Sequence, residues 1–313
     1  MIIKKKRITF VSGCYNEEGN LEELVQRVFR VADKFDQYDF EYIIIDNASV
    51  DRSVKILCGL IKIEPRLRAI VNTRNFGHIR SPYYGMLQAS GDAVIYLASD
   101  LQDPPELIEM FINKWEAGYK VVAAIKEESA ESALFFFVRK LYYEIVSRLA
   151  DVDLLKNFTG FGLYDRVVMD QLRAWEDPYP YHRGMISELG YDIAKVPFKQ
   201  PLRKRGFTKN NIFTLYDIAM LGLTSHTKVP LRLATMMGFA LSIVFFVIGL
   251  VYLFYKLFFW REFSLGLAPL VVGLFFFGSI QLFFIGVLGE YIGSIYTKIA
   301  KRPLVVEKER INF

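Results

Sequence analysis

The chain has 313 residues, 52% of them hydrophobic, and its 39 basic and 34 acidic side chains give a formal net charge of +5. Two cysteines and three isolated histidines exclude a structural zinc site built from clustered Cys and His ligands. The basic N-terminus precedes a short apolar run, 8–11, that is too short for a secretory signal peptide. We therefore expect the N-terminal domain to stay in the cytoplasm, and we expect no nucleic-acid partner.

The first 200 residues alternate short apolar runs with amphipathic segments. This pattern predicts strands at 8–12, 41–45, 69–71, 93–98 and 120–125, and helices at 21–28, 54–61 and 81–90. Asn20 is a plausible N-cap for the first helix, with Glu23 three residues later. The alternation predicts an α/β fold with a mostly parallel sheet, in which ligands lie beyond the carboxyl ends of the strands.

Polar residues recur where the predicted strands end, at 15–17, 46–47, 74–75 and 100–103. In the last group, Asp100, Gln102 and Asp103 supply two carboxylates and an amide oxygen, the ligands that Mg²⁺ takes together with substrate phosphates. The alternative is a capped helix start, with Asp103 as N-cap and Glu106 reaching back.

Asp46 could accept hydrogen bonds from a base or a ribose, although its segment, 46–51, also suits a turn with a helix cap. The three histidines, His78, His182 and His226, form no Ser/His/Asp or Cys/His arrangement, and we expect structural or interfacial roles for them.

No charged residue occurs from Leu233 to Tyr255 or from Phe263 to Gly289, and each stretch is long enough to cross a bilayer as a helix. Five basic residues flank the pair on its outer sides: Lys228, Arg232, Lys298, Lys301 and Arg302. The segment between the two spans contains two basic residues, Lys256 and Arg261. Because basic residues favour the cytoplasmic side, the excess on the outer flanks predicts that both flanks are cytoplasmic. The sequence thus predicts a transmembrane hairpin with spans at about 233–255 and 266–289.

Between residues 199 and 232, seven basic residues stand against Asp217 alone. The apolar stretch 212–223 has helical spacing and predicts a helix on the membrane surface, or alternatively one packed on the soluble domain. The basic residues 203–209 could bind a lipid phosphate or a pyrophosphate, or attract anionic lipid generally. We expect a catalytic domain at 1–200, an interfacial segment at 201–228, and the hairpin with a cytoplasmic tail at 229–313.

Together these motifs resemble the GT-A glycosyltransferases that act on polyprenyl phosphates, including dolichyl-phosphate mannose synthases and GtrB-like undecaprenyl-phosphate glucosyltransferases. The resemblance spans nearly the whole chain. Residues 11–20 match V-x-P-x-Y-N-E-E-x-N, 45–51 match V-D-D-G-S-x-D, 74–77 match R-N-F-G, 100–105 match the end of D-x-D-L-Q-D-P-P, and 203–209 match R-x-x-G-x-S-K. The two trailing spans fit the GtrB branch.

The resemblance implies a Rossmann-like GT-A domain and assigns roles to particular residues. Those implied to bind the nucleotide sugar are Tyr15, Asn16, Glu17, Asp46, Arg74, Asn75, Lys126 and Asn157, the last in a segment similar to the acceptor side. Asp100 and Gln102 would hold Mg²⁺ or Mn²⁺. The catalytic group would comprise Asp100, Asp103, Arg203 and Lys209.

The implied activity is inverting transfer of glucose from UDP-glucose to undecaprenyl phosphate, at the cytoplasmic face of a bacterial inner membrane. The acceptor phosphate has a second pKa of about 6, so it is mostly a dianion at neutral pH and needs no strong general base. Alternatives are transfer of mannose or another sugar, and a sugar-nucleotide-binding membrane protein without catalysis. A missing Q-x-x-R-W signature argues against a processive synthase, and two spans argue against a flippase; a homo-oligomer is compatible with the sequence.

Several positions depart from the family pattern. Gly13 replaces a proline, Asn47 the second Asp of its motif, and Lys126 an arginine, while Gly160 and Gly162 stand where relatives often carry Asp and Arg. The departure that matters most is Ala98, in place of the first Asp of D-x-D. It leaves Asp100, Gln102 and the donor phosphates to hold a metal.

Overall fold

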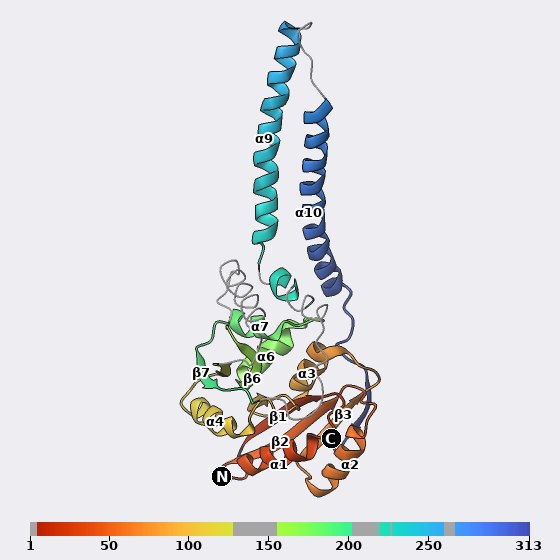
Figure 1. Ribbon diagram of the computed structural model, residues 1–313. Helices are drawn as coiled ribbons and strands as arrows, with labels where there is room; N and C mark the ends of the chain where they lie inside the picture. Colours follow the sequence, from red (N-terminus) through yellow and green to blue (C-terminus); the bar gives the residue numbers. More distant parts are fainter. Residues whose placement is uncertain (1–4, 128–154, 202–216, 218–219, 226, 260–266) are drawn as a thin grey trace.

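The computed structural model describes residues 5–127, 155–201, 217, 220–225, 227–259 and 267–313. In Figure 1 an α/β domain carries two long helices that project away from it. The interfacial helix expected within 201–228 lies mostly outside the described residues, as do Arg203 and Lys209.

An eight-stranded sheet lies at the centre of the α/β domain, in the order β7-β5-β6-β4-β1-β2-β3-β8. Its strands are β1 (Lys6–Cys14), β2 (Tyr38–Asp46), β3 (Leu67–Asn72), β4 (Ala93–Tyr96), β5 (Val121–Lys126), β6 (Phe158–Asp165), β7 (Ile193–Phe198) and β8 (Glu307–Ile311). Strands β4, β1, β2 and β3 are mutually parallel, as are β5 and β7, whereas β6 and β8 run antiparallel to their neighbours. The five predicted strands are confirmed as β1 to β5, and β6, β7 and β8 are additions.

Helices cover both faces of this sheet. They are α1 (Leu21–Ala32), α2 (Ser53–Ile63), α3 (Gly77–Gln88), a 3₁₀ turn (Pro105–Leu107) leading into α4 (Ile108–Glu116), α6 (Arg166–Trp175) and α7 (His182–Glu188). The three predicted helices are confirmed as α1 to α3, although α3 begins four residues before the predicted start at 81. Helix α1 begins after Asn20 as expected, but the Asn20 side chain donates to Glu17 Oε2 (2.6 Å) instead of capping the helix.

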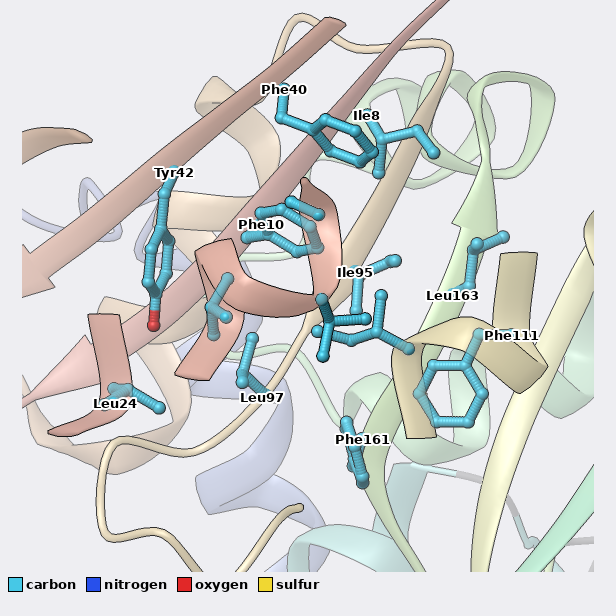
Figure 2. Packing of buried hydrophobic residues seen from close by; sticks show 14 of the residues in the cluster. Ile8, Phe10, Leu24, Phe40, Tyr42, Ile95, Leu97, Phe111, Phe161 and Leu163 are labelled. Atoms are coloured by element: carbon cyan, nitrogen blue, oxygen red, sulfur yellow. The ribbon is translucent and has the colours of Figure 1, made fainter. Parts of the chain in front are cut away.

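Successive side chains of a strand point to opposite faces of the sheet, so alternate residues pack into separate apolar cores on the two faces. Phe10 of β1 packs with α1 and α4 on one face, whereas Val11 packs with α3, α6 and α7 on the other. Figure 2 shows the first core, where the Phe10 and Phe40 rings stack at 5.5 Å and Phe111 meets Phe161 edge-on at 4.9 Å. The sheet is thus clamped between two helical layers, which fixes the ends of its strands.

The two projecting helices are α9 (Val229–Phe258) and α10 (Leu267–Ile299), and together they form a hairpin. Segments long and apolar enough to span a membrane run from Val229 to Val251 and from Gly273 to Ile299, and the structure buries neither of them. At 1.5 Å per residue the two helices measure roughly 45 and 50 Å, longer than the ~30 Å hydrocarbon core of a bilayer. They overlap the predicted spans at 233–255 and 266–289.

After α10 the chain returns to the soluble domain, where its C-terminal end adds strand β8 beside β3. The Thr73 amide donates to the Val306 carbonyl (2.9 Å), and the Tyr84 hydroxyl donates to Glu307 (2.8 Å). The Asn312 amide donates to the Leu67 carbonyl (2.8 Å). The sequence predicts a cytoplasmic tail here but no strand, and β8 makes that tail part of the sheet.

Candidate active site

The carboxyl ends of four parallel strands meet at one edge of the sheet. Cys14, which ends β1, is in register with Asp46, which ends β2, and Asp46 is in register with Val71 of β3. After β4, the Ser99 hydroxyl donates to the Gly13 carbonyl (2.7 Å). The polar groups predicted to follow these strands therefore do lie along a single edge.

Two loops at this edge are interlocked by hydrogen bonds. Asn16 adopts a left-handed conformation (φ 56°), its amide donates to the Ser49 hydroxyl (2.9 Å), and its side chain accepts from the Val50 amide (2.8 Å). The Glu17 amide donates to the Ser53 hydroxyl (3.0 Å). Asn16 and Glu17 thus join the loop after β1 to the loop after β2, while Tyr15 beside them is half-buried.

Asp46 is fully buried, and one of its carboxylate oxygens has no hydrogen-bond partner among the described residues. Its Oδ2 accepts from the Ser49 amide (2.9 Å), whereas no described residue donates to its Oδ1. Burial, more than any other cause, raises the pKa of this carboxyl. Such an oxygen gains from a donor supplied by a ligand, because a buried acceptor without a partner is costly.

Asn47 fastens the R-N-F-G loop, residues 74–77, to the end of β2. Its amide nitrogen donates to Asn75 Oδ1 (2.8 Å) and to the Gly77 carbonyl (3.1 Å), and its oxygen accepts from the Phe76 amide (2.8 Å). A carboxylate could make only the last of these bonds, which accounts for asparagine at this position. Arg74 in the same loop is exposed, with its guanidinium 4.0 Å from the centre of the Phe76 ring.

The segment after β4 separates its two aspartates. Asp100 is half-buried, and its Oδ1 accepts from the Gln102 amide (3.1 Å) across a left-handed Leu101 (φ 61°). Asp103 is 3% exposed and accepts from the Ala98 amide (2.9 Å). Burial, with a contribution from nearby Asp100, raises the pKa of Asp103 to about 6.

The helix-capping alternative for this segment is wrong. The cap position of the 3₁₀ turn is Pro104, without a side-chain cap bond, and Asp103 turns back to Ala98 instead. Glu106 does not reach back either, since it pairs with Arg27 of α1 at 2.7 Å.

Within the described part of the chain, no group of three or more His, Cys, Asp or Glu side chains could hold a metal ion. With Asp103 engaged by Ala98, the oxygen donors left on this segment come from Asp100 and Gln102. This donor set fits Mg²⁺ or Mn²⁺ if a substrate supplies phosphate oxygens, because Mg²⁺ commonly binds through one or two carboxylates plus phosphates.

Two basic side chains, on β5 and α7, lie close enough to Asp103 to affect its ionisation. Lys126, at the end of β5, donates to Gln200 (2.7 Å), and both Lys126 and Arg183 of α7 act to lower the pKa of Asp103. Sequence reasoning missed Arg183, because the Gly-containing segment 182–188 carries little helical signal. Asn157 is exposed with φ 57°, and its carbonyl accepts from the Lys126 amide (3.2 Å).

Close packing accounts for two of the departures from the family pattern. A Cβ on Gly13 would lie 2.7 Å from Pro82 Cγ of α3. A Cβ on Gly162 would lie 2.2 Å from the Val122 carbonyl oxygen in the neighbouring strand. The sheet as built here therefore leaves no room for an arginine at position 162.

Comparisons with known proteins agree with this architecture. The Glycosyl transferase family 2 model matches residues 9–173, and the GtrB C-terminal hairpin model matches residues 229–295. The uncharacterized glycosyltransferase YkcC of Bacillus subtilis is 34% identical over 95% of this chain and 92% of its own length. The SfII prophage-derived bactoprenol glucosyl transferase of Shigella flexneri is 31% identical over 97% of this chain and 98% of its own.

Among solved structures, glucosyl-3-phosphoglycerate synthase from Mycobacterium tuberculosis matches the chain at 16% identity. It aligns with a TM-score of 0.48 over 70% of this chain and 76% of that one. The family match covers the α/β domain from β1 into α6, and the hairpin match covers α9 and most of α10. The chain is therefore a GT-A glycosyltransferase that belongs to glycosyl transferase family 2 and carries a GtrB-type C-terminal hairpin.

Proposed function

We propose that the protein transfers glucose from UDP-glucose to undecaprenyl phosphate, with inversion, at the cytoplasmic face of a bacterial inner membrane. The observation that carries the proposal is the full-length similarity to a protein named bactoprenol glucosyl transferase, which includes the hairpin as well as the catalytic domain. The basic flanks of the hairpin support a cytoplasmic domain.

Residues at the carboxyl ends of the strands would have different roles in binding the nucleotide, the metal and the phosphates. Asp46, with its unmet acceptor oxygen, would bind the base or ribose, beside Tyr15 and the 74–77 loop. Asp100 and Gln102 would hold Mg²⁺ or Mn²⁺, and the bound metal would supply positive charge for the pyrophosphate leaving group. Lys126 would add positive charge near the departing diphosphate, and Arg203 and Lys209 near the acceptor phosphate. The acceptor dianion attacks the anomeric carbon directly, so catalysis is mostly positioning and charge stabilisation.

The test is transfer of radiolabelled glucose from UDP-glucose to undecaprenyl phosphate by the purified full-length protein, with GDP-mannose in parallel. We expect label in the organic phase with Mg²⁺ and little with EDTA. The Asp100→Asn variant should lose at least tenfold in rate, because the metal loses its carboxylate. Asp39→Asn is the matched control, because Asp39 is exposed near the opposite, amino end of β2.

Full turnover by Asp100→Asn at saturating metal would contradict the role of Asp100. Transfer of mannose alone would assign the protein to the mannosyl branch. Nucleotide binding without transfer would favour a non-catalytic binder, the candidate suggested by Ala98 in place of an aspartate.

A further inference from the structure

A cavity of about 160 Å³ lies beside the catalytic edge, between α3, β4, β6 and α7. Residues in its wall include Tyr83, Tyr96, Thr159, His182 and Arg183. Its volume exceeds the 10–15 Å³ or so that one water needs, and it falls short of the roughly 300 Å³ at which pockets for drug-sized ligands begin. The cavity therefore suits a group of about one sugar ring.

His182 is held in this wall with its hydrogen-bonding capacity unused. Its ring lies 5.0 Å from the Tyr164 ring and 5.8 Å from the Tyr83 ring. Both ring nitrogens are buried, and no described residue forms a hydrogen bond with either. The two tyrosine hydroxyls donate elsewhere, to the Gly160 and Leu172 carbonyls.

The imidazole is neutral at physiological pH, because burial, assisted by the charge of Arg183, lowers the pKa of His182 to about 3. A neutral imidazole presents one N–H donor and one acceptor nitrogen. Thr159, also in the cavity wall, has a buried hydroxyl that lacks a hydrogen-bond partner among the described residues. Together these side chains offer unused donors and acceptors without a formal charge.

Gly160 keeps the space beside His182 open. Its φ of +99° favours glycine, and a Cβ there would lie 3.6 Å from His182 Cδ2 and 3.7 Å from the Tyr96 ring. Where relatives often carry an aspartate, this chain therefore adds no carboxylate to the wall beside His182.

The cavity also adjoins the catalytic aspartates. Tyr96 ends β4 four residues before Asp100, and after burial the charges of Asp103 and Asp100 are the next causes that raise the pKa of Tyr96. A group that enters the cavity is thus within electrostatic range of the carboxylates that would face the diphosphate.

We propose that this cavity is the subsite for the uncharged sugar ring of the donor, and that His182 and Thr159 select the sugar through its hydroxyl groups. A sugar hydroxyl both donates and accepts, so a pair of them can satisfy the imidazole and the threonine together. The inference rests on the proposed function, because it takes a nucleotide sugar as the donor.

The test compares dissociation constants of UDP, UDP-glucose, UDP-galactose and GDP-mannose for the full-length protein in detergent with Mg²⁺, measured by titration calorimetry. The variants are His182→Phe and Thr159→Val, each of which removes polar atoms with little change of volume. Asp39→Asn is the control, because Asp39 is exposed near the amino end of β2 and does not line the cavity.

We expect UDP to bind each variant within twofold of wild type, which also reports that the fold is intact. The sugar nucleotide preferred by the wild type should bind three- to tenfold more weakly to His182→Phe and to Thr159→Val, as expected for the loss of one hydrogen bond. The dissociation constants of the different sugar nucleotides should also become more alike in these two variants. Asp39→Asn should change neither quantity.

Unchanged affinity and unchanged discrimination in both polar variants, with sugar transfer still active, would overturn this inference and leave the proposed function standing. Failure of the wild type to bind any of the nucleotides or to transfer a sugar would overturn both. If His182→Phe loses UDP binding through misfolding, Thr159→Val decides the matter, with Thr159→Ser expected to restore wild-type discrimination.

Discussion

Ala98 and Asp103 are joined by a hydrogen bond that defines the segment after β4 at the scale of single residues. The Ala98 amide occupies one oxygen of Asp103, and burial keeps that carboxyl from ionising easily. Asp100, four residues after β4, is half-buried, and its Oδ1 accepts from the Gln102 amide (3.1 Å). We therefore expect the two aspartates to differ in role: Asp100 is the candidate ligand-binding carboxylate, and Asp103 holds the backbone of the segment at Ala98.

The pKa of Asp103 leads to a pH prediction. Because its pKa is raised to about 6 in the folded protein, from 3.8, the folded state holds the proton more tightly, and stability falls as pH rises through this window. Asp103→Asn keeps an oxygen for the Ala98 amide and removes the charge. In EDTA at pH 7.5 we expect it to be more stable than wild type by about 1–3 kcal/mol, a rise of several degrees in Tm.

The advantage should shrink steadily as the pH falls toward 4, because Asp103 is then protonated in the folded state and increasingly protonated in the unfolded state. Scanning fluorimetry from pH 4 to 8 measures this change. A constant difference across that range would contradict the assignment. Asp39→Asn serves again as the exposed control.

Strand β8 is the element that most changes the molecule relative to expectation. It covers the edge of β3, and Ile311 packs against the apolar core. Arg310 bridges to Gln88 of α3 (2.7 Å) and to Glu307 (2.7 Å). An otherwise open sheet edge is thereby paired, which also protects it from association with other chains.

Removal of residues 307–313 should destabilise the domain by about 2–4 kcal/mol, through lost edge hydrogen bonds and exposed apolar surface. Hydrogen–deuterium exchange should rise in the peptide that covers β3, while β5 on the far side of the sheet stays protected. Lys308→Ala is the control, since Lys308 is exposed. Unchanged exchange in β3 after truncation would show that β8 contributes little.

The elements that sequence could predict are those whose own pattern is strong. Strands β1 to β5 are apolar runs that end in polar residues, and α1 has clear helical spacing. Strand β8, with the sequence EKERI, is charged, and its partner β3 lies more than 230 residues earlier, so no local signal predicts it. Strand β6 contains two glycines and β7 a proline, both unfavourable in strands.

The same division holds for the site. Asp46, Asp100 and their neighbours could be found because they directly follow predicted strands. His182, Arg183 and Thr159 could not, because the cavity that unites them exists only once α7 packs against β6 and α3. The family resemblance identified Gly160 as a departure from the family pattern but did not explain it. The explanation comes from its left-handed backbone and from the His182 imidazole beside it.

For the molecule as a whole, the sheet itself constrains membrane topology. Strands β7 and β8 belong to one sheet, and the chain between them contains α9 and α10. If both helices cross the bilayer, the residues before α9 and those after α10 must lie on the same side. This conclusion agrees with the charge bias and does not depend on it.

Thiol labelling tests that arrangement. In a background with Cys14 and Cys58 replaced by alanine, single cysteines at Lys228→Cys and Lys308→Cys should react with an impermeant maleimide from the same side of sealed vesicles. Glu262→Cys, at a position between α9 and α10 in the sequence, should react only from the other side. Labelling of the first two positions from opposite sides would refute a two-span hairpin.

The chain leaves the sheet after one outer strand, β7, and rejoins it at the other outer strand, β8. Seven strand intervals of about 4.8 Å separate those strands, so the two attachments are roughly 34 Å apart. A domain held by a single linker can swivel about it, whereas a domain held at two distant points loses that rotation. The edge of the sheet with Asp46 and Asp100 would then keep a fixed orientation relative to the bilayer. A lipid-borne acceptor would therefore approach the bound donor from the same direction each time.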